Sequence, residues 1–250
     1  MPEWQDDAIV LSARPFGETD AVVSLLTREH GRHAGLVYAA QSRRKRGAFE
    51  AGNAVQASWR ARLDEQLGVY SLELVKNPSS LVLDSPLRLA GLSSACALLE
   101  TTLAERLPQA ELFHSTAALI DIIALSDTDA DWLRLYVRWE LFLLSQLGFG
   151  LRLESCTLTG RTDNLAYVSP RTGHAVGRDD AGDFAPRMLA LPAFLVPEGS
   201  SGHGCSDSAS ELENGFTLSA HFLERRVFRP VDKELPQARQ RLADLMLKIC

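Results

Sequence analysis

The hydrophobic residues of this chain change their period near residue 80, and that change restricts the fold more than any other feature. Before it, short apolar runs alternate with clusters of Gly, Asp, Glu, Ser and Arg, the spacing of a small all-β unit. The five runs cover residues 7–13, 21–27, 34–40, 54–62 and 67–75. After it, apolar residues recur at helical spacing. The sequence therefore predicts an α+β protein whose strands precede its helices.

Five short strands in about 75 residues favour a partly open Greek-key barrel of the OB type. The fourth run alternates apolar and polar residues, and successive side chains of a strand point to opposite faces. Trp59 is therefore expected to face the core, whereas Arg60 and Arg62 share the other face.

Helix signals begin at Asp84-Ser85-Pro86, a capping sequence with Pro in the first turn. Helices are expected over 87–107, 110–125 and 129–148, the last ended by Gly148, with two closing helices near 209–229 and 235–249. Residues 151–183 predict a small irregular lobe and 197–215 a mobile segment. The domains expected are an OB domain at 1–80, a helical domain at 81–150, the lobe at 151–195, and a mobile segment with C-terminal helices packing on the helical domain at 196–250.

Composition restricts the class of protein. With 250 residues and 46% hydrophobic content the chain can bury a core, and no run approaches the ~18 apolar residues of a membrane span. No signal peptide is expected and the sequence has no CxxC motif, so the four cysteines are expected to be reduced thiols in the cytoplasm.

Charge is spread unevenly along the chain. Residues 28–62 hold eight basic and two acidic side chains, a net charge of +6, whereas the remaining 18 basic and 30 acidic residues give −12. A positive segment in an acidic protein indicates a local anion site rather than general attraction to polyanions.

The run Arg43-Arg44-Lys45-Arg46 is the sharpest feature of that segment. Four consecutive cations repel one another, and a polyanion would offset this repulsion and release its own counterions. The alternative is a solvated loop. Because the run joins two strands of an expected OB barrel, we favour nucleic-acid contact, with Tyr38 and Tyr70 available either for base stacking or for packing.

Signatures of catalysis and metal binding are scarce. The sequence has no GxxxxGK[ST], GxSxG or HExxH motif. His30 and His33 lack a third ligand and are expected at the surface, and Cys156 lacks the partners of a tetrahedral zinc site. We therefore expect no enzymatic activity, no metal and no cofactor.

Two stretches resemble the bacterial DNA repair and recombination protein family RecO. The first is "DAIVLSARPFGETDAVVSLLTREHGRHAGLVYAAQSRRKRG", with a Gly-Glu-Thr-Asp corner, a Leu-Thr-x-Glu-x-Gly turn and a basic loop in order. The second is "LYVRWELFLLSQLGFGLRLESCTLTGRTDNLAYVSPRTGHAV", with a helix ending in Leu-Gly, a Cys-x-x-x-Gly and a Ser-Pro-x-x-Gly lobe. The resemblance reaches about residue 195 and extends more loosely to the C-terminal helices.

The resemblance implies an N-terminal OB domain, a helical middle and a small zinc-ribbon-like lobe, which in this sequence lacks the four cysteine ligands and keeps Cys156 alone. It also implies a recombination mediator that binds single- and double-stranded DNA, anneals complementary strands and helps to load RecA on DNA coated by single-strand binding protein (SSB). The implied partners are RecR and the acidic C-terminal tail of SSB, with RecA engaged indirectly and no membrane. The implied location is the cytoplasm, at the nucleoid.

Basic side chains supply the candidate sites. Those expected to face DNA are Arg43, Arg44, Lys45 and Arg46, followed by Arg32, Arg60 and Arg62. An acidic tail that ends in Phe would need an apolar pocket rimmed by cations. Two groups could form such a rim, although solvated helix charges are the plainer alternative; they are Arg134 with Arg138, and Arg225 with Arg226 and Arg229.

The sequence therefore predicts a non-enzymatic DNA-binding recombination mediator. Two other classes of protein stay open. An RNA-binding OB protein would share the barrel and the basic loop, and a protein-interaction scaffold would use its acidic helical layer instead.

Overall fold

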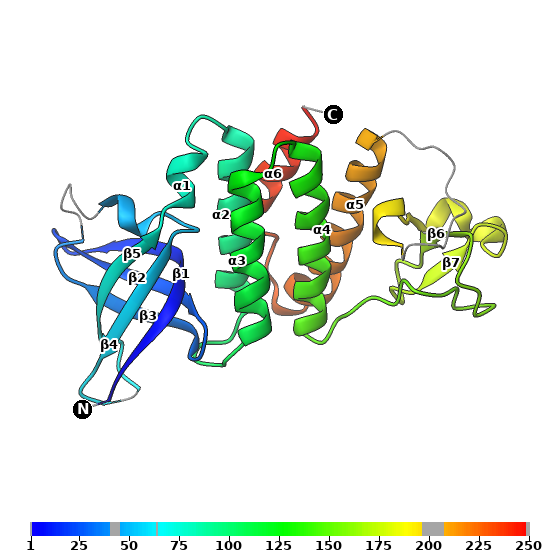
Figure 1. Ribbon diagram of the computed structural model, residues 1–250. Coiled ribbons are helices and arrows are strands. Elements are labelled where there is room, and N and C mark those ends of the chain that lie inside the picture. The colour runs from blue at the N-terminus through cyan, green and yellow to red at the C-terminus, as the bar shows by residue number, and fades with distance from the viewer. Residues whose placement is uncertain (1, 41–45, 64, 197–207, 249–250) are drawn as a thin grey trace. The chain divides into compact units, whose positions relative to one another are not determined.

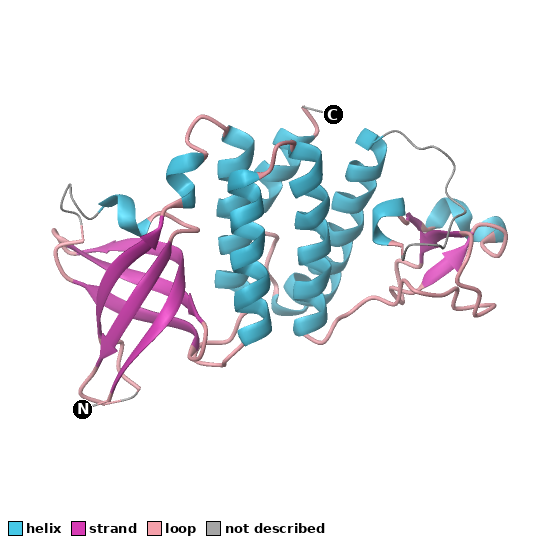
Figure 2. Ribbon diagram, viewed as in Figure 1, coloured by secondary structure: helices cyan, strands magenta, loops and turns pink. Residues whose placement is uncertain are grey.

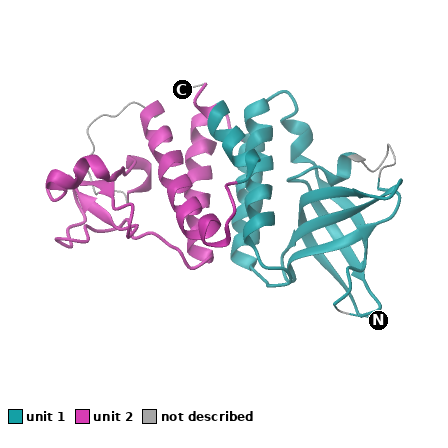
Figure 3. Ribbon diagram, turned by 180° about the vertical axis from the view of Figure 1, so that it is seen from behind, with its two compact units in different colours: residues 1–125, 236–245 teal, residues 126–235, 246–250 magenta. Residues whose placement is uncertain are grey.

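The structure is a computed structural model that describes residues 2–40, 46–63, 65–196 and 208–248. The chain forms two compact units, one of residues 1–125 with 236–245 and one of residues 126–235 with 246–250 (Figure 3). The domain limits inferred from the sequence stay a prediction.

A closed ring of five strands opens the first unit (Figure 1). The strands are β1 (Glu3–Phe16), β2 (Asp20–Thr27), β3 (Gly31–Val37), β4 (Ala54–Arg60) and β5 (Val69–Lys76), and they neighbour one another in the order β1-β2-β3-β5-β4. This confirms the OB-type barrel, although the ring is closed and not partly open as expected. Neighbours are antiparallel except β3 and β5, which run parallel and close the ring through one pair, Leu36 with Val69.

β1 is long because it serves two neighbours. Glu3 to Ile9 pair with β4, and Ala8 to Phe16 pair with β2, with a bulge between Val10 and Ser12. The strand begins four residues before the start that the apolar run predicted. β4 ends at Arg60, two residues earlier than expected, so Arg62 follows the strand instead of sharing its face.

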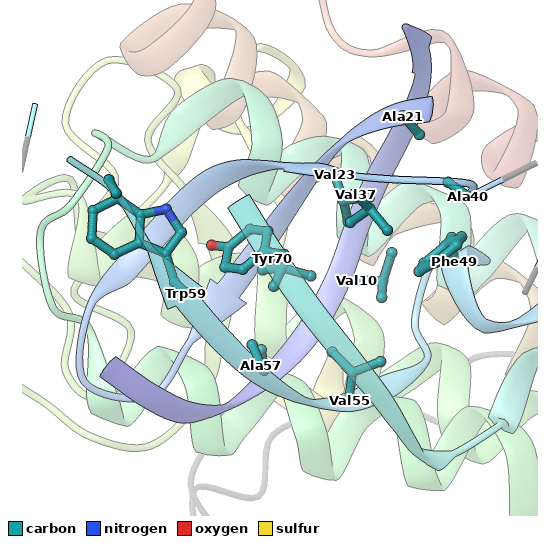
Figure 4. Packing of buried hydrophobic residues seen from close by; sticks show 13 residues of the cluster. Val10, Ala21, Val23, Val37, Ala40, Phe49, Val55, Ala57, Trp59 and Tyr70 are labelled. Atoms are coloured by element: carbon teal, nitrogen blue, oxygen red, sulfur yellow. The ribbon is translucent and has the colours of Figure 1, made fainter. Parts of the chain in front are cut away.

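Inward-facing side chains of all five strands form the barrel core (Figure 4). Trp59 and Tyr70 are each 3% exposed and close one end of this core, and Val55 and Ala57 on β4 alternate with outward polar residues. The core position predicted for Trp59 is confirmed.

Four helices contribute to the first unit (Figure 2): α1 (Pro78–Leu81), α2 (Pro86–Thr102), α3 (Ala110–Leu125) and α6 (Gln237–Met246), of which the last residue belongs to the second unit. Ser85 caps α2, because its hydroxyl accepts the Arg88 amide hydrogen. The thiol of Cys96 on α2 donates to the Val10 carbonyl of β1 at 3.5 Å, so α2 packs directly on the barrel. The sequence did not predict the single turn α1.

The second unit combines two longer helices with a small sheet. α4 (Asp129–Gln146) and α5 (Ser208–Phe222) pack together, and α5 continues as a π-helical turn, η4 (Leu223–Phe228), and a 3₁₀ turn, η5 (Arg229–Val231). The sheet has the order β7 (Ala175–Gly177), β6 (Leu165–Val168), β8 (Leu189–Ala190). One 3₁₀ turn, Gly182–Arg187, lies between β7 and β8 in sequence, and another, Ala193–Leu195, follows β8. Of the segment expected to be mobile, residues 208–215 are helical, and 197–207 lie outside the described residues. Within the described parts of the chain, no helix is long and apolar enough to span a bilayer.

Candidate nucleic-acid interface

A groove of about 1230 Å³ opens on the barrel of the first unit. It is bounded by β1, β4 and β5 on one side and by the end of β3 and the 3₁₀ turn η1 (Arg46–Phe49) on the other. The groove lies where β3 and β5 share only the Leu36–Val69 pair, so the ring is least tightly joined beside it. Its lining residues are Glu3, Trp4, Gln5, Val37, Tyr38, Ala48, Phe49, Ser58, Trp59, Arg60, Val69, Tyr70, Ser71, Leu72, Glu73 and Leu74.

Cross-strand register gives the groove a polar floor. Ser58 of β4 lies opposite Gln5 on one side and Ser71 on the other, so three uncharged hydrogen-bonding side chains form one row. Arg60 occupies the next outward position and is exposed. Two acidic residues, Glu3 and Glu73, also line the groove and limit its positive charge. Such a surface can hold an extended polar chain.

The opposite side of the barrel is covered by helix α2. Ile9, Leu11, Ser24 and Leu26 are buried although they lie outside the barrel core, which is the burial expected under a helix that packs on β1. OB modules commonly bind oligonucleotides across strands 2 and 3. In this protein part of that face is buried, and the open groove lies over β1, β4 and β5 instead.

Only the last residue of the basic run lies within the described residues. Arg43, Arg44 and Lys45 lie outside the described residues, and Arg46 opens η1. In sequence the run stands between Tyr38 and Ala48, both of which line the groove. Two residues of extended chain span about 7 Å, so Arg46 lies within that reach of the groove rim at Ala48.

Arg32 holds the barrel to the helices. Its Nε donates to the Leu103 carbonyl at 3.0 Å, and its Nη1 lies 3.2 Å from Glu105 and 3.9 Å from Glu100. The side chain is only 16% exposed. These contacts give Arg32 a structural role, and its contact with DNA stays a prediction.

Arg60 and Arg62 are both exposed, one at the end of β4 and one in the β4–β5 loop. A third cation joins them from a distant part of the sequence. Arg106 follows α2, its Nη2 donates to the Gln66 carbonyl at 2.8 Å, and its guanidinium lies 6.0 Å from the centre of the Trp59 ring. Charge counting along the chain missed Arg106, because it stands 44 residues after Arg62 and is isolated from other basic residues.

The structure gives different outcomes for the aromatic and histidine side chains singled out in the sequence. Tyr70 is buried in the core, whereas Tyr38 is 55% exposed at the groove. His33 was expected at the surface, and this is wrong: it is 3% exposed, and its Nδ1 lies 2.9 Å from the Tyr70 hydroxyl. Burial, reinforced by the charge of Arg106, lowers the pKa of His33 to about 4. His30 is partly exposed and stacks on Trp4 at a centroid distance of 4.2 Å.

The candidate partner-binding cations all lie in the second unit. Arg138 donates through Nε to the Phe194 carbonyl at 3.0 Å, and Arg134 lies 3.7 Å from Asp131. The arginines that follow α5 differ in how many contacts they make with other groups of the protein. Arg226 donates to the carbonyls of Phe149 and Thr172 and stacks on Phe222, Arg229 pairs with Glu224, and Arg225 is exposed. Of these five arginines, Arg226 makes the most contacts that stabilise the fold.

The Cys156 thiol makes hydrogen bonds with other groups of the protein. Its thiol donates to Asp180 at 3.1 Å and accepts the Gly177 amide hydrogen at 3.3 Å. Over the described residues, no cluster of three or more His, Cys, Asp or Glu side chains could hold a metal ion.

The fold and the groove together define an OB-barrel protein that continues into a helical layer and a small β-sheet lobe. Family models for the N-terminal and C-terminal parts of recombination protein O match residues 1–78 and 83–234. The chain therefore belongs to the recombination protein O (RecO) family.

Three relatives named DNA repair protein RecO support this assignment. The protein of Rhodospirillum centenum is 52% identical over 97% of this chain and 94% of its own length. Those of Rhodospirillum rubrum and Gluconacetobacter diazotrophicus are 45% and 40% identical, each over 98% of this chain and over 96% and 95% of their own lengths. Membership in this family supports a role in DNA repair.

Proposed function

We propose that this chain is a DNA-binding recombination mediator that has no enzymatic activity and no cofactor. It binds single- and double-stranded DNA, anneals complementary strands and assists the loading of RecA on SSB-coated DNA at the nucleoid. One observation carries the proposal: the open groove on an OB barrel is flanked in sequence by the run Arg43–Arg46.

Binding follows from charge neutralisation. Phosphates that enter the groove meet Arg60, with Arg62 and Arg106 at the adjoining loop, and the basic run ends in sequence two residues before the groove residue Ala48. Each neutralised phosphate releases counterions, so the affinity is driven by the backbone and depends weakly on base sequence. Annealing follows because the cations screen the repulsion between two strands while the base edges stay available for pairing.

The partners RecR and the SSB tail rest on family membership together with the five arginines of the second unit. Arg225 is exposed, and Arg138 is exposed while its Nε holds the Phe194 carbonyl. We propose that an acidic tail meets this set: Arg134, Arg138, Arg225, Arg226 and Arg229.

The deciding experiment is fluorescence-monitored annealing of complementary oligonucleotides that have been coated with SSB. The protein should accelerate annealing on coated strands, and SSB without its acidic tail should abolish the acceleration. Annealing only of naked strands would contradict partner contact, and no effect on either would contradict the mediator function. Stronger binding of RNA than DNA in direct competition would favour the RNA-binding alternative, and no binding of either would favour a protein scaffold.

A further inference from the structure

Two exposed aromatic rings lie at one end of the barrel, and the phosphate-driven mechanism does not use them. Phe16, the last residue of β1, is 56% exposed, and Tyr38, directly after β3, is 55% exposed. Single exposed apolar residues are common on protein surfaces and need no explanation. Two exposed rings carried by strand ends on either side of β2, one of them lining a candidate binding groove, form a more specific arrangement.

Asp20 connects the two positions. It pairs with Phe16 across the β1–β2 hairpin, and its Oδ1 accepts the Ala39 amide hydrogen at 2.9 Å. Phe16 and Tyr38 are therefore carried by the ends of β1 and β3, on either side of the start of β2. Neighbouring strands lie about 4.8 Å apart, so the two backbones are separated by roughly 10 Å.

The position of this pair on the fold points to a ligand. Tyr38 lines the groove, and Phe16 borders the loop between strands 1 and 2, one of the two loops with which OB modules bind oligonucleotides. Glu18 in the same loop is exposed and opposes phosphate, whereas the Asp20 carboxylate is engaged by Thr19 and Ala39. Arg14, two residues before Phe16, is exposed and can meet a phosphate, whereas the flat apolar face of each ring suits the face of a base better than it suits a phosphate.

We infer that Phe16 and Tyr38 stack on unpaired bases and give the barrel a preference for single-stranded DNA over duplex. This inference rests on the proposed function and specifies its substrate class. In a duplex the bases are already stacked on one another, so the rings add affinity only where bases are unpaired. Base–aromatic stacking strengthens binding by about fivefold or more for each base.

The test compares three probes of equal length: an oligothymidylate, the same backbone with abasic sites, and a duplex. The variants are Phe16→Leu, Tyr38→Leu and their combination, with Phe16→Trp and Tyr38→Trp as ring-retaining variants. Phe184→Leu is the matched control, because Phe184 is 64% exposed in the second unit.

The expected result is a loss of about fivefold per leucine substitution for oligothymidylate, about 25-fold for the double variant, with less than a twofold change for the abasic and duplex probes. The tryptophan variants and Phe184→Leu should bind like wild type, and the salt dependence should not change. Equal losses on all three probes, or no loss on oligothymidylate, would overturn the inference and leave the proposed function standing. If wild-type protein binds none of the probes, the proposed function fails and the inference fails with it.

Discussion

At Gly68 the backbone passes so close to Trp59 that a side chain has no space. A Cβ there would lie 2.3 Å from the indole Nε1, which donates to the Leu67 carbonyl at 3.0 Å, and the φ angle of Gly68 is +65°. Gly68→Ala therefore combines a left-handed backbone penalty with displacement of a core indole. We expect a loss of about 2–5 kcal/mol in the free energy of unfolding, measured by urea denaturation.

Gly17→Ala is the control for that substitution. Gly17 has nearly the same φ, +64°, but nothing lies within 4 Å of its Cβ position. Only the backbone penalty of about 1–2 kcal/mol should remain. Equal losses in the two variants would show that the Trp59 contact contributes nothing.

His33 should make the stability of the barrel sensitive to pH. Its pKa is about 4 in the folded protein and 6.5 in the unfolded chain, because burial, and then Arg106, disfavour the charged imidazole. Between these values only the unfolded state binds the proton, so the free energy of unfolding falls as the pH falls below 6.5. The His33 contribution at pH 5.0 should be a loss of about 2 kcal/mol relative to pH 7.5.

Denaturation of wild type and His33→Gln at both pH values measures this contribution. The variant should lose less stability on acidification, whereas His114→Gln, at an exposed position of α3, should behave like wild type. If His33→Gln is as sensitive to acid as wild type, His33 is not the group responsible.

At the scale of elements, the packing of α4 on α5 contains a buried polar contact. The Ser219 hydroxyl of α5 donates to the Glu140 carboxyl of α4 at 2.6 Å, and both side chains are fully buried. Ser219→Ala removes this buried hydrogen bond to the Glu140 carboxyl group. We expect a loss of about 1.5–3 kcal/mol in the free energy of unfolding.

Thr217→Ala is the control within α5, because Thr217 is exposed and alanine favours helix. It should leave stability unchanged or slightly raised, as followed by thermal denaturation. A Ser219→Ala variant as stable as Thr217→Ala would show that the contact with Glu140 has no net value.

The strands were predictable because alternation and turn residues are local signals. All five barrel strands were found, although the limits of β1, β3, β4 and β5 differ from the predicted ones by up to four residues. The pattern even contained the position of His33, which shares its face with Gly35 and Val37 of β3. His33 was predicted at the surface because its polarity was given more weight than its position in the strand alternation. The groove and Arg106 were not predictable, since both depend on segments that only the ring closure and the α2–α3 connection bring together.

At the scale of the whole molecule, the proposed DNA binding depends on charge asymmetry. Residues 28–62 carry +6 on a chain that otherwise carries −12, so only part of the surface attracts a polyanion. If three to five phosphates are neutralised, the logarithm of the affinity for single strands should fall with the logarithm of salt concentration with a slope of about −2 to −3.5.

The basic run should supply most of that slope. Replacing Arg43, Arg44, Lys45 and Arg46 together by Ala should reduce the magnitude of the salt slope by about 2–3. Fluorescence anisotropy measures this slope between roughly 50 and 300 mM salt, the range over which counterion release is resolved. A matched variant removes the same charge from exposed positions of the second unit, by changing Arg171, Arg178, Arg187 and Lys233 to Ala. Because attraction at a distance depends on total charge but counterion release depends on contact, the matched variant should keep the wild-type slope. Equal flattening in both variants would mean that net charge, and not the basic run, governs binding.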